Sequence, residues 1–181
     1  MPQGEGLKPR PRHTIFQHER TKRICMQYYE DLVPGTITHS PRSYKVTREE
    51  VIEFASKYDP QPFHLDDKAA ENTFFGKLSA SGWHTTAMTM RLMVETMNAG
   101  EPRAGLGSPG VDELKWIKPV YPGDELRVQS TLLSKRRMKS RPDMGLTRSK
   151  TEVFNQDDEL VLSMIGNGLM RVRDPDAPVE D

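Results

Sequence analysis

The sequence predicts an α+β fold in which an antiparallel sheet wraps around a long buried helix. Residues 83–99 form a nearly uncharged segment with apolar side chains at helical spacing. Residues 111–173 instead show strand patterns separated by turn signals, and a single weaker strand pattern at residues 35–46 precedes the helices. One strand, a helix that needs burial and several strands able to cover it form a two-layer α+β arrangement.

The first half of the chain is predicted to hold one strand and two helical segments before the long helix. Residues 35–46 alternate weakly and carry Thr and Tyr side chains that favour strands. Thr47 is predicted to open a helix, because Glu50 three residues later completes a capping-box pattern. Pro60 ends that helix, since the residue before a proline is disfavoured in helical conformation. Residues 66–72 are predicted to form one or two further helical turns.

The long helix predicted at residues 83–99 has Arg91 and Glu95 as its only charged side chains. A helix that is apolar nearly all round is a buried one. We therefore expect this helix to lie inside the core, with its methionines acting as core filler rather than as a binding groove.

The second half of the chain is predicted to consist of longer antiparallel strands. They contain Leu114 and Trp116, then Leu126 and Val128 after a Pro-Gly-Asp turn, then residues 147–154, and then residues 160–172. The polar residues 155–158 between the last two strands predict a hairpin turn. Gly166 and Gly168 inside the final strand predict a bulge or a close approach of the backbone to a neighbour.

The chain is predicted to be one domain with weaker ends, because 181 residues are few for two full domains. Residues 1–30 are predicted to be a flexible N-terminal arm, rich in proline and basic residues at its start and able to pack onto the body or a partner subunit further on. Residues 31–173 make the folded body, and residues 174–181 make an acidic, solvated tail.

Composition argues against several classes of function. The 26 Lys and Arg residues balance 26 Asp and Glu residues, so the basic excess typical of nucleic-acid-binding and membrane-surface proteins is missing. We expect neither a membrane span nor a signal peptide, and therefore a cytoplasmic protein. The single cysteine, Cys25, cannot form an internal disulfide or a zinc knuckle.

The first candidate for chemistry is the pair Asp59 and His64, which lie five residues apart in a segment that contains Pro60 and Pro62. Because proline fixes φ, this short loop loses little entropy when it orders, and it can hold both side chains toward one pocket. An Asp and a His that share a water molecule can perform general acid–base catalysis near neutral pH. The alternative is structural: Asp59 ends the helix and His64 packs beneath the loop.

The second candidate is the segment of small residues that leads into the long helix, Ser81-Gly82 followed by Trp83 and His84. A helix N-terminus offers unpaired N–H donors and a partial positive charge, which suit a developing oxyanion such as a thioester enolate. Gly82 would let a ligand approach the backbone closely. The alternative is an ordinary helix start, with Ser81 as the N-cap.

Taken together, these motifs resemble a known family. Residues 58–66 (YDPQPFHLD), residues 81–85 (SGWHT) and residues 120–126 (VYPGDEL) are similar to segments of the MaoC-like dehydratases, the hot-dog-fold group that includes the R-specific enoyl-CoA hydratases. The resemblance covers about residues 31–173 and follows the family's order of elements. It implies a hot-dog fold, with the antiparallel sheet wrapped around the long helix.

The resemblance also implies roles for individual residues. Asp59 and His64 match the catalytic acid–base pair, and Gly82 matches the backbone donor that holds the thioester carbonyl. The substrate-binding positions by the same comparison are Gln61, Ser81, Trp83 and His84. Members of this family add water to a 2-enoyl-CoA, or remove it from a 3-hydroxyacyl-CoA, without a metal or redox cofactor. Coenzyme A would then enter only as part of the thioester substrate.

The chain departs from the family's pattern at several positions. Tyr58 and Gln61 stand where the family usually has Gly and Asn. Met90 and its neighbour Thr89 lie where the hydratases tend to place a hydroxyl side chain, and Trp83 and His84 replace smaller or aliphatic residues. These departures bear more on the acyl specificity than on the reaction type.

Two other groupings have a functional and a structural interpretation. The basic residues 135–141 could bind the phosphates of coenzyme A, or they could form a solvated strand end. His64, His84, Asp59 and Asp66 are not predicted to form a metal site, because no pair of histidines on one helix has metal-ligand spacing.

The sequence is compatible with three functions. The first is an acyl-CoA hydratase or dehydratase that works through Asp59 and His64. The second is a non-catalytic hot-dog module that binds acyl thioesters or serves as an assembly partner, and the third is an acyl-CoA thioesterase, which would release free thiol. Exposed sheet edges, together with the family's habit, predict a homodimer or a higher homo-oligomer.

Overall fold

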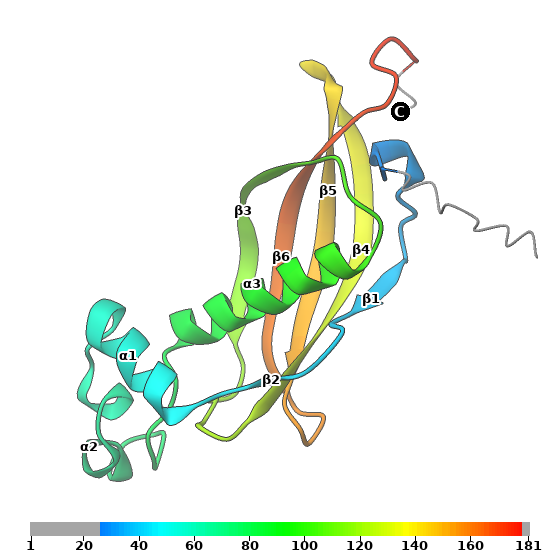
Figure 1. Cartoon of the computed structure of the whole chain (residues 1–181). Coiled ribbons are helices and arrows are strands. Elements are labelled where there is room, and N and C mark those ends of the chain that lie inside the picture. The colour runs from blue at the N-terminus through cyan, green and yellow to red at the C-terminus, as the bar shows by residue number, and fades with distance from the viewer. Residues whose placement is uncertain (1–25, 179–181) are drawn as a thin grey trace, which may run out of the picture.

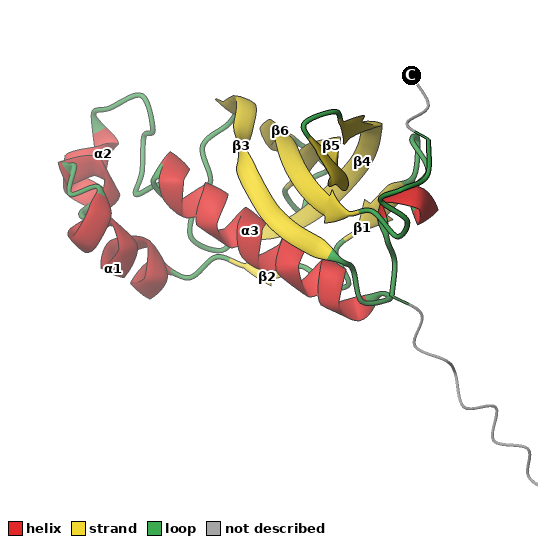
Figure 2. Ribbon diagram, turned by 90° about the horizontal axis from the view of Figure 1, so that it is seen from above, coloured by secondary structure: helices red, strands yellow, loops and turns green. Residues whose placement is uncertain are grey.

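The computed structural model describes residues 26–178, and within this range six strands form one antiparallel sheet around a long helix. The strand order is β1-β4-β5-β6-β3, and the short β2 pairs with β4. The long strands β3 (Gly105–Trp116), β4 (Glu125–Met138), β5 (Arg141–Phe154) and β6 (Leu160–Arg171) curve over helix α3 (Gly82–Ala99), as Figures 1 and 2 show. The predicted α+β arrangement is therefore confirmed.

The predicted hairpin between the last two strands is also confirmed. The side-chain oxygen of Asn155 accepts hydrogen bonds from the backbone N–H groups of Asp157 and Glu159, which closes the turn. Gly168 is a point of close approach, since a Cβ there would lie 2.7 Å from the Thr147 hydroxyl oxygen. In the pairing of β3 with β6, the register shifts come from extra residues in β3, and not from a bulge at Gly166.

The single strand predicted at residues 35–46 is instead two short strands, β1 (Ile37–His39) and β2 (Tyr44–Lys45). Pairing to β4 stops after Ser40, whose hydroxyl accepts a hydrogen bond from the Val128 N–H. Pro41 follows. A proline has no N–H to donate to a ladder, so the strand is interrupted there.

The helices before α3 begin as predicted. In α1 (Arg48–Tyr58), the Thr47 side chain accepts a hydrogen bond from the Glu50 N–H, while the Glu50 carboxylate accepts from the hydroxyls of Thr47 and Tyr44. The Asp66 side chain caps α2 (Asp67–Glu71) in the same way. Both helices lie at one end of α3 (Figure 1).

Helix α3 is buried on one face only, which corrects the prediction of burial all round. Leu92 is fully buried against the sheet. On the opposite face the large apolar side chains are exposed, namely Trp83, Met90, Val94 and Met97. The sheet covers a single side of the helix (Figure 2), so a pattern that is apolar all round leaves an uncovered apolar face in one chain.

The beginning of the described chain is anchored to the sheet. The ring of Tyr29 packs directly on Gly145 of β5, and the Lys135 ammonium lies 4.8 Å from the centre of the same ring. Lys135 also donates hydrogen bonds to the carbonyls of Tyr29 and Glu30. Residues 1–25 of the predicted flexible arm lie outside the described residues, so that prediction remains untested for them.

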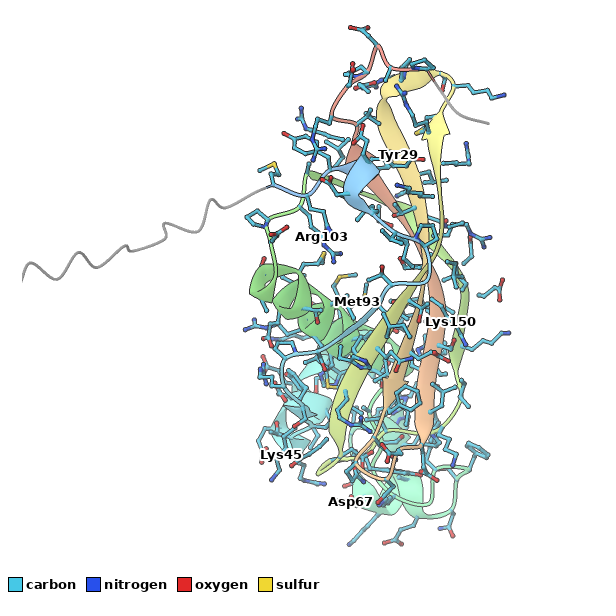
Figure 3. All side chains as sticks on the ribbon, turned by 90° about the vertical axis from the view of Figure 1, so that its right-hand side faces the viewer. Tyr29, Lys45, Asp67, Met93, Arg103 and Lys150 are labelled. Carbon is cyan, nitrogen blue, oxygen red and sulfur yellow. The ribbon has the colours of Figure 1, made fainter. Side chains whose placement is uncertain are left out.

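Two of the basic residues 135–141, Lys135 and Arg137, hold segments near the two ends of the described chain, and a contact of this stretch with coenzyme A phosphates stays a prediction. Arg137 donates to the carbonyls of Pro142, Pro175 and Ala177, and so binds the start of the acidic tail. This stretch lies at the end of the sheet near Tyr29, far from Asp67 of α2 at the opposite end (Figure 3).

Candidate active site

The segment between α1 and α2 carries the first two candidate residues. Asp59 ends α1, where its N–H still donates to the Ala55 carbonyl. The chain then turns sharply through a short 3-10 helix, Pro62–His64. The His64 N–H donates to the Gln61 carbonyl, which closes the turn. The fixed φ angles of Pro60 and Pro62, together with this hydrogen bond, direct the Asp59 and His64 side chains toward each other.

Asp59 and His64 face each other across a gap of 3.7 Å, measured from Asp59 Oδ2 to His64 Nε2. This distance is too long for a direct hydrogen bond. It allows one water molecule to contact both atoms.

The ring of His64 is held in one tautomer. Its Nδ1 lies 2.7 Å from the carbonyl oxygen of Ser79, and the Ser79 hydroxyl oxygen is 3.3 Å away. Because a carbonyl only accepts, Nδ1 carries a hydrogen, and Nε2 is the ring nitrogen that faces Asp59. The ring is buried and lies between the rings of Phe63 and Phe75. The ring orientation of His64 is therefore fixed, with Nε2 toward Asp59.

The carboxylate of Asp59 accepts a hydrogen bond on each oxygen. The Ser81 hydroxyl donates to Oδ2 at 2.6 Å, and the Gln61 amide donates to Oδ1 at 2.7 Å. Burial acts to raise the pKa of Asp59, but the hydrogen bonds from Ser81 and Gln61 lower it below its ordinary value, and a positive charge on His64, when the ring is protonated, lowers it further. Asp59 is thus ionised at neutral pH.

Gly82 is the first residue of α3. The residue before it, Ser81, connects the start of this helix to the Asp59 carboxylate. The Ser81 hydroxyl oxygen accepts a hydrogen bond from the Trp83 N–H, so the predicted N-cap is present. As a first-turn residue, Gly82 has no acceptor for its N–H within the helix. This donor is the kind of group that stabilises an oxyanion.

The glycine at position 82 also has a packing reason that differs from the predicted approach of a ligand. A Cβ there would lie 2.6 Å from two atoms of the Trp116 indole. The Trp116 N–H donates to the Thr86 hydroxyl, which holds the indole against the first turn of α3. Trp116 of β3 thus fills the space beside Gly82.

The predicted site residues divide into two groups. Asp59, Gln61 and Ser81 form one hydrogen-bonded cluster, with His64 3.7 Å from Asp59 and Gly82 next to Ser81. The side chains of the other two predicted residues lie outside it: the Trp83 side chain is exposed and packs on Trp116, and the His84 ring is buried and stacks on Phe54. Only the backbone N–H of Trp83 contacts the cluster, through its hydrogen bond to Ser81. Their roles toward substrate, and the catalytic roles of the cluster, remain predictions.

Two residues of the site were missed by sequence reasoning. Ser79 contributes a backbone carbonyl, which any residue could supply, so no side-chain signal marks it. Trp116 was read only as part of a strand. Its contact with Gly82 could not be inferred from the sequence, because it arises only when β3 packs against α3.

Residues 26–178 contain neither a metal-binding cluster nor a helix that could cross a membrane. No three His, Cys, Asp or Glu side chains in this range are arranged to hold a metal ion. No helix in the described chain has the length and apolar character needed to cross a membrane. The cytoplasmic location stays a prediction.

Comparison with known proteins places the chain in a family. The family model of the MaoC like domain matches residues 32–153, which is more than half of the chain. The chain belongs to the MaoC-like family. The crystal structure of the MaoC-like dehydratase from Rhodospirillum rubrum is 40% identical, with a TM-score of 0.74, and the match covers 82% of this chain and 99% of that one.

Two further matches concern the fold and a relative of known name. A conserved hypothetical protein from Mycobacterium tuberculosis with a double hot-dog fold has a TM-score of 0.66 at 16% identity, covering 86% of this chain and 47% of that one. The hot-dog fold is confirmed. The mesaconyl-CoA hydratase of Cereibacter sphaeroides is 39% identical over 69 residues, which are 38% of this chain but only 20% of that relative.

Proposed function

We propose that this MaoC-like protein is a hydratase and dehydratase that adds water reversibly to the C2=C3 double bond of a 2-enoyl-CoA thioester. The observation that carries the proposal is the 3.7 Å gap between an ionised Asp59 and the free Nε2 of His64. The match to the MaoC like domain and the partial match to a mesaconyl-CoA hydratase support it.

In the hydration direction, the water lies between Asp59 and His64. Nε2 of His64 takes one proton of the water while the water oxygen forms a bond to C3. The electrons of the double bond move to the thioester, and the negative charge on its carbonyl oxygen meets the Gly82 N–H at the start of α3. Asp59 accepts a hydrogen bond from the second hydrogen of the water and stabilises the imidazolium.

The imidazolium then gives its proton to C2, which leaves a 3-hydroxyacyl-CoA and restores neutral His64. Asp59 does not supply this proton, because the hydrogen bonds from Ser81 and Gln61 keep it ionised. Dehydration follows the same steps in reverse. Coenzyme A takes part only as the thioester group of the substrate.

The test is turnover of a panel of straight-chain, branched and carboxylated 2-enoyl-CoA thioesters. Turnover is measured as the loss of enoyl absorbance, and the product is identified by its mass. We expect a gain of one water on at least one thioester. Binding without turnover would favour a non-catalytic module. Release of free thiol without hydration would identify a thioesterase, and either result would overturn the proposal.

We further propose that two copies pair through β3. This strand is an edge of the sheet, and its apolar side chains Val111 and Trp116 are exposed, with Trp116 packed on Trp83 of the uncovered face of α3. Antiparallel pairing of β3 with a second β3 would satisfy the free edge of both chains and cover both apolar faces at once. Sedimentation equilibrium is expected to give twice the chain mass, and a monomer at micromolar concentration would contradict it.

A further inference from the structure

The hydroxyl of Ser81 contacts both the Asp59 carboxylate and the first turn of α3. It is fully buried, and it makes two hydrogen bonds in opposite senses. Its oxygen accepts from the Trp83 N–H at 3.2 Å, and its hydrogen is donated to Asp59 Oδ2 at 2.6 Å. A hydroxyl has one hydrogen and two lone pairs, so both bonds can exist together without conflict.

The Ser81 hydroxyl contacts one particular oxygen of the Asp59 carboxylate. Asp59 Oδ2 is the same oxygen that faces His64 Nε2 across the 3.7 Å gap. The hydrogen bond from Ser81 therefore sets the position of the oxygen that contacts the water. Gln61 holds only the other oxygen, Oδ1.

From this we infer that Ser81 is a positioning residue for the reaction, which fixes the Asp59 carboxylate relative to the oxyanion-binding N–H groups of α3. The inference rests on the proposed function and deepens it. Because one side chain caps the helix and holds the carboxylate, any shift of the α3 N-terminus moves both groups together. Water and thioester oxygen are then bound at a constant separation, as an oriented reaction requires.

The hydroxyl two turns into the helix does not take this part. Thr89 is buried, and its hydroxyl donates to the Thr85 carbonyl within α3. The N-cap Ser81 is thus the hydroxyl of α3 that reaches Asp59 in the described structure.

The two functions of Ser81 can be separated by substitution. Ser81→Gly removes the donor to Asp59, but glycine is tolerated at an N-cap position almost as well as threonine, so α3 still begins there. Ser81→Thr keeps both the donor and the acceptor. Thr47→Ala is the matched control, because it removes the same type of cap from α1 without touching Asp59.

Two measurements apply to all variants. The first is the pKa of the Asp59 carboxyl, followed by carbon NMR of the folded protein without substrate. The groups that act on this carboxyl are His64, which can carry charge, and the neutral donors Ser81 and Gln61. We expect the pKa to rise by about one unit in Ser81→Gly, because a hydrogen bond to the charged form is lost, and to stay unchanged in Ser81→Thr and Thr47→Ala.

The second measurement is the pH dependence of hydration. In Ser81→Gly, kcat is expected to fall by about tenfold to a hundredfold with KM nearly unchanged, since the hydroxyl is fully buried and already bonded to Asp59 and the Trp83 N–H. The acidic limb of the profile should move to higher pH. An Asp59 pKa in Ser81→Gly equal to that of the wild type would overturn the inference. Absence of hydratase activity in the wild type would overturn the proposed function instead, and the NMR result would still decide whether Ser81 holds the Asp59 carboxylate.

Discussion

The contact between Gly82 and Trp116 makes a strong prediction about a substitution that is normally mild. Alanine in the first turn of a helix usually stabilises a protein by about 0.5–1 kcal/mol relative to glycine. Here its Cβ would lie 2.6 Å from the Trp116 indole, whereas carbon atoms pack at about 3.5–4 Å. The indole or the start of α3 must therefore move by about 1 Å.

We expect Gly82→Ala to lower the free energy of unfolding by about 1–3 kcal/mol, the usual cost of overpacking. A displacement of about 1 Å at the oxyanion-binding N–H should also lower kcat/KM by about a hundredfold. The assays are urea unfolding and enoyl-CoA hydration. Gly100→Ala at the other end of α3 is the control, because its Cβ has no neighbour within 4 Å.

A second substitution tests the cause. Trp116→Leu in the Gly82→Ala background frees the space beside position 82 and should recover part of the lost stability, so the two substitutions should not be additive. If Gly82→Ala alone were as stable and as active as the wild type, the packing argument would be refuted.

Three further predictions concern stability. Leu92→Ala should cost about 2–5 kcal/mol in urea unfolding, whereas Met90→Ala should change the stability of the unpaired chain by no more than about 0.5 kcal/mol; equal costs in the monomer would contradict the one-sided burial of α3. Burial lowers the pKa of His84, so as the pH falls below about 6.5 the unfolded chain binds a proton that the folded chain resists, and stability should drop; His84→Phe should remove that drop, and an unchanged pH profile would count against it. Gly145→Ala should displace the Tyr29 ring and speed limited proteolysis next to it, and unaltered cleavage would exclude this anchor.

The parts of the fold that depend on neighbours in sequence could be predicted well. Thr47 and Asp66 cap their helices because the bonds reach only three residues along the chain. The proline-stiffened turn that brings Asp59 toward His64 is likewise local. Pro41 carried an equally local signal, since it cannot pair in a ladder, and the division into β1 and β2 could have been inferred from it.

The parts that depend on distant neighbours could not be predicted. The apolar pattern of α3 predicts that every face needs cover, but it does not say which faces this chain itself covers, so the exposure of Met90 was missed. The bond from Ser81 to Asp59 spans 22 residues, and the contact of Trp116 with Gly82 joins β3 to α3. Such contacts follow from packing and leave no periodic signal.

The central claim is that Asp59 and His64 together activate water. The most direct test compares hydration of a 2-enoyl-CoA by the wild type, Asp59→Asn and His64→Gln, with folding checked by circular dichroism and thioester binding by calorimetry. We expect both variants to fold and bind but to lose activity by at least about a hundredfold, the usual contribution of a general acid–base group. Full activity in either folded variant would contradict the mechanism.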